Sequence, residues 1–126
     1  MSRARYEAMV HAMCAAVDAG DAAAFGAWFA EDATYTFANN PALTGRAAIV
    51  EATAGAAGVL PWVRHVVEQV AVVGQQLFCR FTIKTEAPGG GELALPCVTV
   101  IWLDGDRIVD YRVHMDLSPA VGVRAG

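Results

Sequence analysis

The sequence has few charged residues and no cluster of basic ones. Charged residues make up 17% of the 126 residues, and the formal net charge is −4 at pH 7. A protein that binds the phosphate backbone of a nucleic acid needs several lysines or arginines on one face. We therefore expect no nucleic-acid partner.

Long apolar runs are also missing, although 56% of the residues are hydrophobic. Much of this excess is alanine, which is common in the helices of soluble proteins. The longest candidate run, Val59 to Val63, contains Pro61 and is far shorter than the roughly 20 residues that span a bilayer. His11 and Asp18 interrupt what would be the apolar core of a signal peptide. We expect a soluble, cytoplasmic protein with no membrane partner.

The cysteines show neither a disulfide framework nor the spacing of metal ligands. There are three of them, Cys14, Cys79 and Cys97, an odd number at wide separations. Free cysteine is among the most buried residue types. The sequence therefore predicts three core thiols and no metal site.

What is present in the first half is a helical pattern. Apolar residues recur at helical spacing from Arg3 to Ala19, and Gly20 ends this first helix. Asp21 is a natural N-cap for a short second helix within residues 22–32. Residues 33–38 read as a strand, residues 39–45 as a loop, and a third helix is expected from about Arg46 to Ala57.

In the second half the apolar period changes to two, which predicts four strands. Their expected ranges are Val63 to Val73, Leu77 to Ala87, Glu92 to Leu103 and Arg107 to Leu117. Short glycine-containing turns join them, so an antiparallel meander follows. Helices first and strands afterwards indicate a single α+β domain over residues 1–126, with three helices on one face of a curved sheet and a frayed tail from about residue 120.

Alternation within the strands assigns inward-facing side chains. In the first of the four strands His65 and Gln69 are expected to point inward among valines, because the other face carries Arg64 and Glu68. Odd-numbered residues are assigned to the inner face in the second and fourth strands. The ligand-binding candidates are Phe37, Gln69, Phe81, Ile83, Val98, Val113 and Met115.

The strand from Glu92 to Leu103 is apolar on both faces. A strand with this pattern is covered on both sides. Helices can cover one side only, so we expect a homodimer that forms through the outer face of the sheet.

Four segments in this order resemble the nuclear transport factor 2-like superfamily, which includes SnoaL-like polyketide cyclases, ketosteroid isomerases and scytalone dehydratases. They are "VDAGDAAAFGAWFAEDATYTF", "LTGRAAIVEA", "RHVVEQVAVVGQQLFCRF" and "LDGDRIVDYRVHMDLSP". The resemblance covers nearly the whole chain. It implies a cystatin-like cone with an apolar pocket for a small hydrophobic ligand.

The matching positions lack the catalytic residues of two kinds of enzyme in this superfamily. The two aspartates and the arginine of limonene epoxide hydrolases are matched by Ile83, Val113 and Phe81. The carboxylates of ketosteroid isomerases find no counterpart near Phe37 or in residues 97–100.

Three residues remain as catalytic candidates. His65 matches a histidine that scytalone dehydratase-like and many SnoaL-like members carry, and it is either a general acid/base or a core histidine bound to a backbone carbonyl. Asp18 matches the dehydratase aspartate, and it is either catalytic or a cap of the turn into the second helix. Tyr35 either donates a hydrogen bond to a ligand oxygen or packs beneath the helices.

These residues predict a SnoaL-like enzyme that works without a cofactor. It would transfer a proton, through His65, on a small hydrophobic carbonyl-bearing molecule, as a cyclase, isomerase or dehydratase does. One alternative is a non-catalytic protein that binds a small molecule in the same pocket. Another is a subunit whose role is association through the outer face of the sheet.

Overall fold

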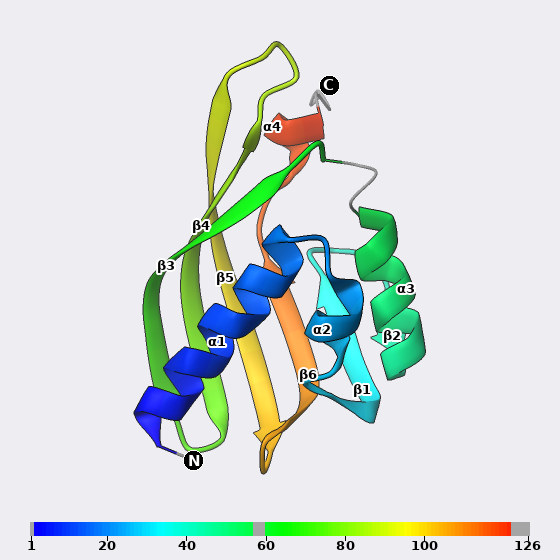
Figure 1. Ribbon diagram of the computed structural model, residues 1–126, viewed down its shortest axis with the longest axis vertical. Coiled ribbons are helices and arrows are strands. Elements are labelled where there is room, and N and C mark those ends of the chain that lie inside the picture. Colours follow the sequence, from blue (N-terminus) through cyan, green and yellow to red (C-terminus); the bar gives the residue numbers. More distant parts are fainter. Residues whose placement is uncertain (1, 57–59, 122–126) are drawn as a thin grey trace.

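The computed structural model describes residues 2–56 and 60–121 (Figure 1). A six-stranded sheet with the order β2-β1-β6-β5-β4-β3 carries helices on one face, as the α+β prediction requires. The elements are α1 (Arg3–Asp18), α2 (Ala22–Gly26), β1 (Phe29–Phe37), β2 (Leu43–Thr44), α3 (Arg46–Ala56), β3 (Val63–Val73), β4 (Gln76–Glu86), β5 (Glu92–Asp104), β6 (Arg107–His114) and α4 (Ser118–Val121).

Side-chain caps and a glycine define the first two helices. The hydroxyl of Ser2 accepts a hydrogen bond from the backbone N–H of Arg5 at the start of α1, and Asp21 accepts one from Ala24 at the start of α2. Between them Gly20 adopts a φ of +74°, which a glycine tolerates best. The apolar stripe of α1 is buried, as its spacing predicts, and packs against β3.

The second helix is shorter than the sequence pattern suggests. It ends at Gly26, and β1 begins at Phe29, which is fully buried and pairs with Ile108 of β6. The N–H of Ile108 also donates to the carbonyl oxygen of Trp28. Pairing with β6 therefore overrides the helical propensity of residues 27–32.

Gly26 allows α2 and α3 to approach closely. A Cβ atom at this position would lie 2.2 Å from Cγ2 of Val50, which no real contact permits. The two helices therefore need a glycine at this crossing.

The sheet is antiparallel except for one pair. β1 and β6 run parallel, with Tyr35 opposite Tyr111 and Phe37 opposite Val113. The short strand β2 lies in the segment expected to be a loop and pairs with β1. At the other end of the chain, β6 stops at His114, three residues before its expected end, and residues 118–121 form α4. The last two residues of α4 fall in the tail predicted to fray from about residue 120, and residues 122–126 of that tail lie outside the described residues. Ala120 of α4 is buried against the core.

A bulge in β3 changes which side chains face inward. Val67 pairs with Phe81 and Gln69 pairs with Arg80, so Glu68 is the extra residue. Beyond it the inner face carries Val70 and no longer the odd-numbered residues. A second register shift, between β5 and β6, places Ile108 in the core at 0% exposure and displaces Val109 from the inner position predicted for it.

Within residues 2–56 and 60–121, no helix is both long enough and apolar enough to cross a bilayer.

Candidate functional site

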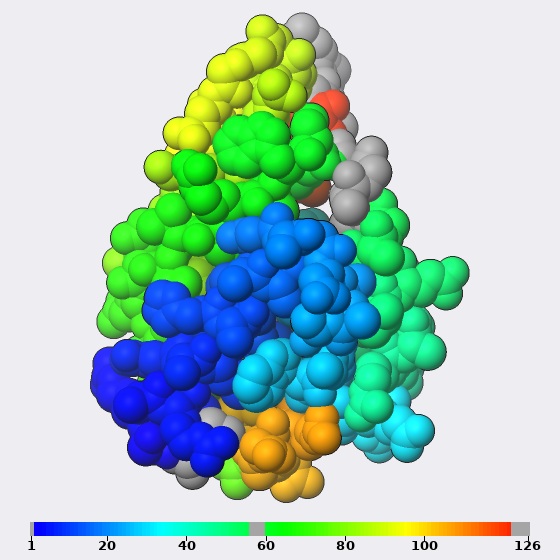
Figure 2. All heavy atoms as spheres, viewed as in Figure 1, coloured from blue at the N-terminus to red at the C-terminus, as the bar shows by residue number. Residues whose placement is uncertain are grey.

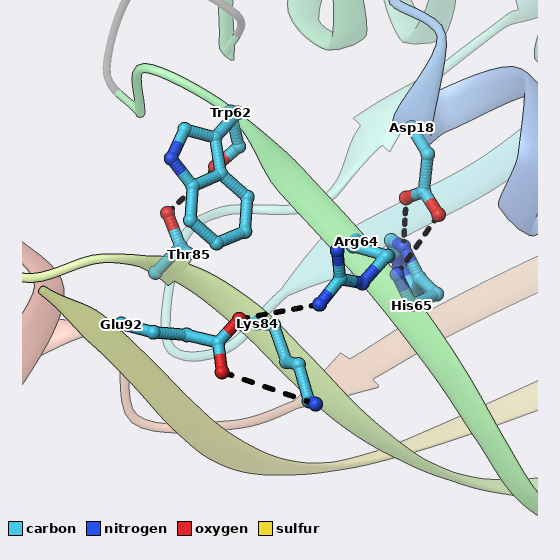
Figure 3. A network of polar contacts seen from close by, with 7 residues as sticks. All are labelled: Asp18, Trp62, Arg64, His65, Lys84, Thr85 and Glu92. Carbon is cyan, nitrogen blue, oxygen red and sulfur yellow. Dashed lines mark hydrogen bonds and ion pairs between the residues drawn. The ribbon is translucent and has the colours of Figure 1, made fainter.

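Asp18 and His65 meet where the end of α1 passes the start of β3 (Figure 3). The backbone N–H of His65 donates to one carboxylate oxygen of Asp18 at 2.9 Å, and Nδ1 of the ring lies 2.6 Å from the other. The side chain of Asp18 is 23% exposed and that of His65 is 14% exposed. One carboxylate therefore holds both the backbone and the ring of a single histidine.

This contact determines which ring nitrogen carries the proton. An ionised carboxylate only accepts hydrogen bonds, so Nδ1 must be the donor. In the neutral ring Nε2 is then left with its lone pair free, and in the charged ring Nε2 is a donor. The arrangement of carboxylate and imidazole is one that supports general acid/base chemistry.

Asp21 caps the second helix, as predicted. The hydrogen bonds of Asp18 run to His65 and not to the turn into that helix. The structure brings Asp18 together with His65, across 47 positions of the chain.

Apolar side chains adjoin the imidazole. The ring of Phe81 meets it edge-on, with centroids 5.5 Å apart and an angle of 83°. Ile83, opposite His65 in the ladder, is 3% exposed, and Leu95 lies next to it on β5. Further along the inner face, Val113 is buried, and Phe37 and Met115 are partly buried against the core.

Tyr35 lies within an aromatic cluster. Its ring is stacked on that of Tyr111, with centroids 5.4 Å apart, and Phe25 meets both rings edge-on. Burial raises the pKa of Tyr35 to about 12, and nearby Cys97 adds to the rise. The phenol is therefore a protonated hydrogen-bond donor at neutral pH.

Residues 10–111 match the model of the SnoaL-like domain. The chain belongs to the SnoaL-like family. This match covers most of the chain, from the middle of α1 into β6. It confirms the resemblance inferred from the sequence segments.

Solved structures show the same fold at low sequence identity. A protein of Catenulispora acidiphila with a ketosteroid isomerase-like fold, in complex with trimethylamine, is 24% identical, with 90% of this chain and 88% of that chain covered and a TM-score of 0.80. A SnoaL-like polyketide cyclase-type protein of Jannaschia sp. CCS1 is 19% identical, with 91% and 92% covered and a TM-score of 0.74. TerC, crystallised with polyporic acid, is 14% identical, with 90% and 95% covered and a TM-score of 0.80. No curated protein matches the sequence.

Two of the candidate ligand-binding residues of this SnoaL-like chain face away from the interior. Gln69 is exposed and pairs with Arg80 on the outer face, because the bulge at Glu68 reverses the alternation. Val98 is 40% exposed and lies between Arg80 and His114. The inward position predicted for Gln69 is therefore wrong, and Val98 lies on the face opposite to the other ligand-binding candidates.

The outer side of the same strands carries a separate set of polar contacts. Arg64 points away from His65 and bonds Glu92 at 3.2 Å, and Glu92 also lies 3.9 Å from Lys84 (Figure 3). These contacts tie β3, β4 and β5 together behind the imidazole. Thr85, by contrast, is fully buried on the inner face of β4, and its hydroxyl donates to the carbonyl oxygen of Trp62 at 2.7 Å.

Tyr111 is the inner-face residue to which the sequence assigned no role. Alternation places it inward, but its position beside Tyr35 depends on the parallel pairing of β1 with β6. A prediction that β1 and β6 pair in parallel would have placed the two tyrosines side by side.

The three cysteines are buried and free, as predicted. Burial raises the pKa of the Cys14 and Cys79 thiols to about 12. Among residues 2–56 and 60–121, no group of three or more histidine, cysteine, aspartate or glutamate side chains is arranged to hold a metal ion.

Proposed function

We propose that this SnoaL-like protein is an enzyme that transfers a proton at the carbon beside a carbonyl group of a small apolar molecule, without a cofactor. The observation that carries the proposal is the contact between Asp18 and His65. It leaves Nε2 of His65 free to exchange a proton with a ligand. The apolar residues Phe81 and Ile83 beside the ring favour an uncharged ligand.

The chemical step is a proton abstraction. Nε2 of His65 takes a proton from the carbon next to the carbonyl, the electron pair of that C–H bond moves to the carbonyl oxygen, and an enolate forms. Asp18 stabilises the imidazolium, and the phenol of Tyr35 donates to the developing oxyanion. The imidazolium then returns the proton to the enolate, at the same carbon or at another one.

This chemistry suits the family to which the chain belongs. SnoaL-like polyketide cyclase-type proteins share its fold, and TerC shares it while holding polyporic acid. A positioned acid/base of this kind contributes about 10²–10⁴-fold to a rate. A hydrogen-bond donor to the oxyanion adds a comparable factor, about 10²–10³-fold.

The experiment is hydrogen–deuterium exchange at the carbon beside the carbonyl. A panel of cyclic ketones, including 1-tetralone, 2-tetralone and cyclohexanone, is incubated with the protein in D₂O and followed by proton NMR. We expect the wild type to accelerate the exchange of at least one ketone, and His65→Gln to lose at least about 10²-fold of that acceleration. His114→Gln is the matched control, because His114 is exposed on the outer face.

A second candidate function is non-catalytic binding of a small molecule. The largely apolar surroundings of the imidazole, with Phe81, Ile83 and Leu95 at most 5% exposed, favour it. A binding protein would take up the ketones without accelerating exchange. His65→Gln would then change affinity only. Equal exchange rates for the wild type and His65→Gln would overturn the enzymatic proposal.

A further inference from the structure

Tyr111 stands beside Tyr35 in a way that its packing role does not require. The two residues are in register on neighbouring parallel strands, and their rings are stacked at an angle of 8° with centroids 5.4 Å apart. Tyr111 is 7% exposed. Phenylalanine would fill the same space without bringing a hydroxyl group into the core.

The distance between the two rings allows both hydroxyl groups to bond the same oxygen atom. In-register side chains on parallel strands point in the same direction, so the two hydroxyl groups are separated by about the 5.4 Å that separates the ring centroids. An oxygen atom near the midpoint then lies about 2.7–3.1 Å from each hydroxyl oxygen, which is the normal length of an O–H···O hydrogen bond.

Both hydroxyl groups are available for such a bond. Within the described parts of the chain, neither phenol forms a hydrogen bond to another residue, and no fully enclosed side-chain oxygen or nitrogen is left without a partner. Taken together, these facts mean that a water molecule can reach the phenol oxygens. Burial raises the pKa of Tyr111 well above 10, so its phenol, like that of Tyr35, keeps the proton that it would donate.

A series of neighbouring interior residues connects the phenols with the imidazole. Cys14 lies on the same face of α1 as Asp18, four residues earlier, and the carboxylate adds to the rise that burial causes in the Cys14 pKa. Cys14 in turn adds to the rise in the pKa of Tyr111. Across the sheet, Cys97 pairs with Phe81, whose ring contacts the ring of His65. Cys97 also adds to the rise in the pKa of both phenols.

We propose that Tyr35 and Tyr111 form a two-phenol clamp that holds a single ligand oxygen by two hydrogen bonds. The inference rests on the proposed function and extends it. Tyr111 becomes a second donor to the enolate oxygen. The ligands are then molecules with an enolisable ketone whose oxygen atom reaches both tyrosine hydroxyl groups. The two donors act on charge that develops in the transition state, where such bonds contribute most.

The test uses 4-nitrophenolate as a copy of an enolate and nitrobenzene as a copy without the oxygen. Dissociation constants of both probes are measured by absorbance and calorimetry for the wild type, Tyr35→Phe, Tyr111→Phe and Tyr6→Phe. Tyr6 is the matched control, since it is a buried tyrosine on α1 outside the aromatic cluster. Circular dichroism and thermal unfolding verify that each variant is folded.

We expect Tyr35→Phe and Tyr111→Phe each to weaken the binding of 4-nitrophenolate by about tenfold to a hundredfold. Neither variant should change the affinity for nitrobenzene, and Tyr6→Phe should change neither affinity. If Tyr111→Phe binds 4-nitrophenolate as Tyr6→Phe does, or if the wild type binds both probes equally well, the clamp is overturned.

The two proposals fail in different ways. Loss of ketone exchange in His65→Gln together with unchanged phenolate binding in Tyr111→Phe would remove the clamp and leave the proton transfer. Weaker phenolate binding in Tyr111→Phe, with exchange unchanged in His65→Gln, would leave the clamp and remove the proton transfer.

Discussion

At the scale of single residues, the carboxylate of Asp18 positions His65 in the candidate site. Asp18 accepts hydrogen bonds from the backbone and from the ring of His65, so it joins the end of α1 to β3 and selects the ring tautomer. The resemblance to scytalone dehydratases proposed each residue separately. Their contact could not be predicted from local patterns, because it depends on how α1 crosses the sheet (Figure 2).

Asp18→Asn should reverse the tautomer of His65. An amide can still accept from the backbone N–H, but its NH₂ group then faces Nδ1 and donates to it, so the ring proton moves to Nε2. Nitrogen-15 NMR should show the Nδ1–H form in the wild type and the Nε2–H form in the variant. Ketone exchange should fall by about 10²–10⁴-fold. The exposed His11 and His114 serve as internal controls, and an unchanged His65 tautomer would contradict the assignment.

The buried thiols make a prediction about alkaline stability. Burial raises the pKa of Cys14 and Cys79 from 9.0 to about 12, so between these values the unfolded chain loses thiol protons that the folded chain keeps. The contribution of the two thiols to the stability is therefore fully present well below pH 9 and is lost as the pH rises through 9 toward 12. The two thiols together should lower the free energy of unfolding by about 2–3 kcal/mol between about pH 8 and pH 10.

Urea unfolding at several pH values measures this decline. The double variant Cys14→Ala, Cys79→Ala should show a flatter dependence on pH, even though its stability at pH 7 is lower because of the lost packing. An equal slope in the wild type and the variant would contradict the assignment of the decline to these thiols.

At the scale of the element, the sequence predicts strands better than it predicts their faces. The bounds of β3, Val63 and Val73, are those expected from the apolar period, and His65 lies on the expected face. The bulge at Glu68 then reverses the alternation, so Gln69 faces outward. No glycine or proline marks this bulge, and a single extra residue leaves the apolar composition of the strand unchanged. The inward position of Gln69 therefore could not be corrected from the sequence.

Deleting Glu68 tests what the bulge does. Without the extra residue, either His65 or the pair Val70 and Val72 must change faces. Exposure of two core valines costs about 3–6 kcal/mol. We expect chemical denaturation to show a loss of this order. Deletion of Gly89, in the exposed turn between β4 and β5, is the control and should cost much less. Similar losses for both deletions would mean that the bulge has no special role.

At the scale of the whole molecule, the outer face of the sheet carries apolar residues in the open. Phe78 on β4 is 38% exposed and Val98 on β5 is 40% exposed, and Val100, two residues after Val98, pairs with Phe78. Charges of both signs flank them, with Arg80 next to Val98 and Glu68 bonded to Thr82 on the same face. In a dimer with a two-fold axis the same patch is buried on both copies.

We propose that a second copy of the chain covers this face, as the two-sided apolar pattern of residues 92–103 predicts. The wild type should have the mass of a dimer at micromolar concentration in analytical ultracentrifugation and small-angle scattering. Val98→Lys should be a monomer, because it would bury a second positive charge next to Arg80 without a partner. Val121→Lys is the control, since Val121 is 41% exposed on α4 and does not belong to the strands of this face. A monomeric wild type would exclude the homodimer, and a monomer in both variants would place the contact elsewhere.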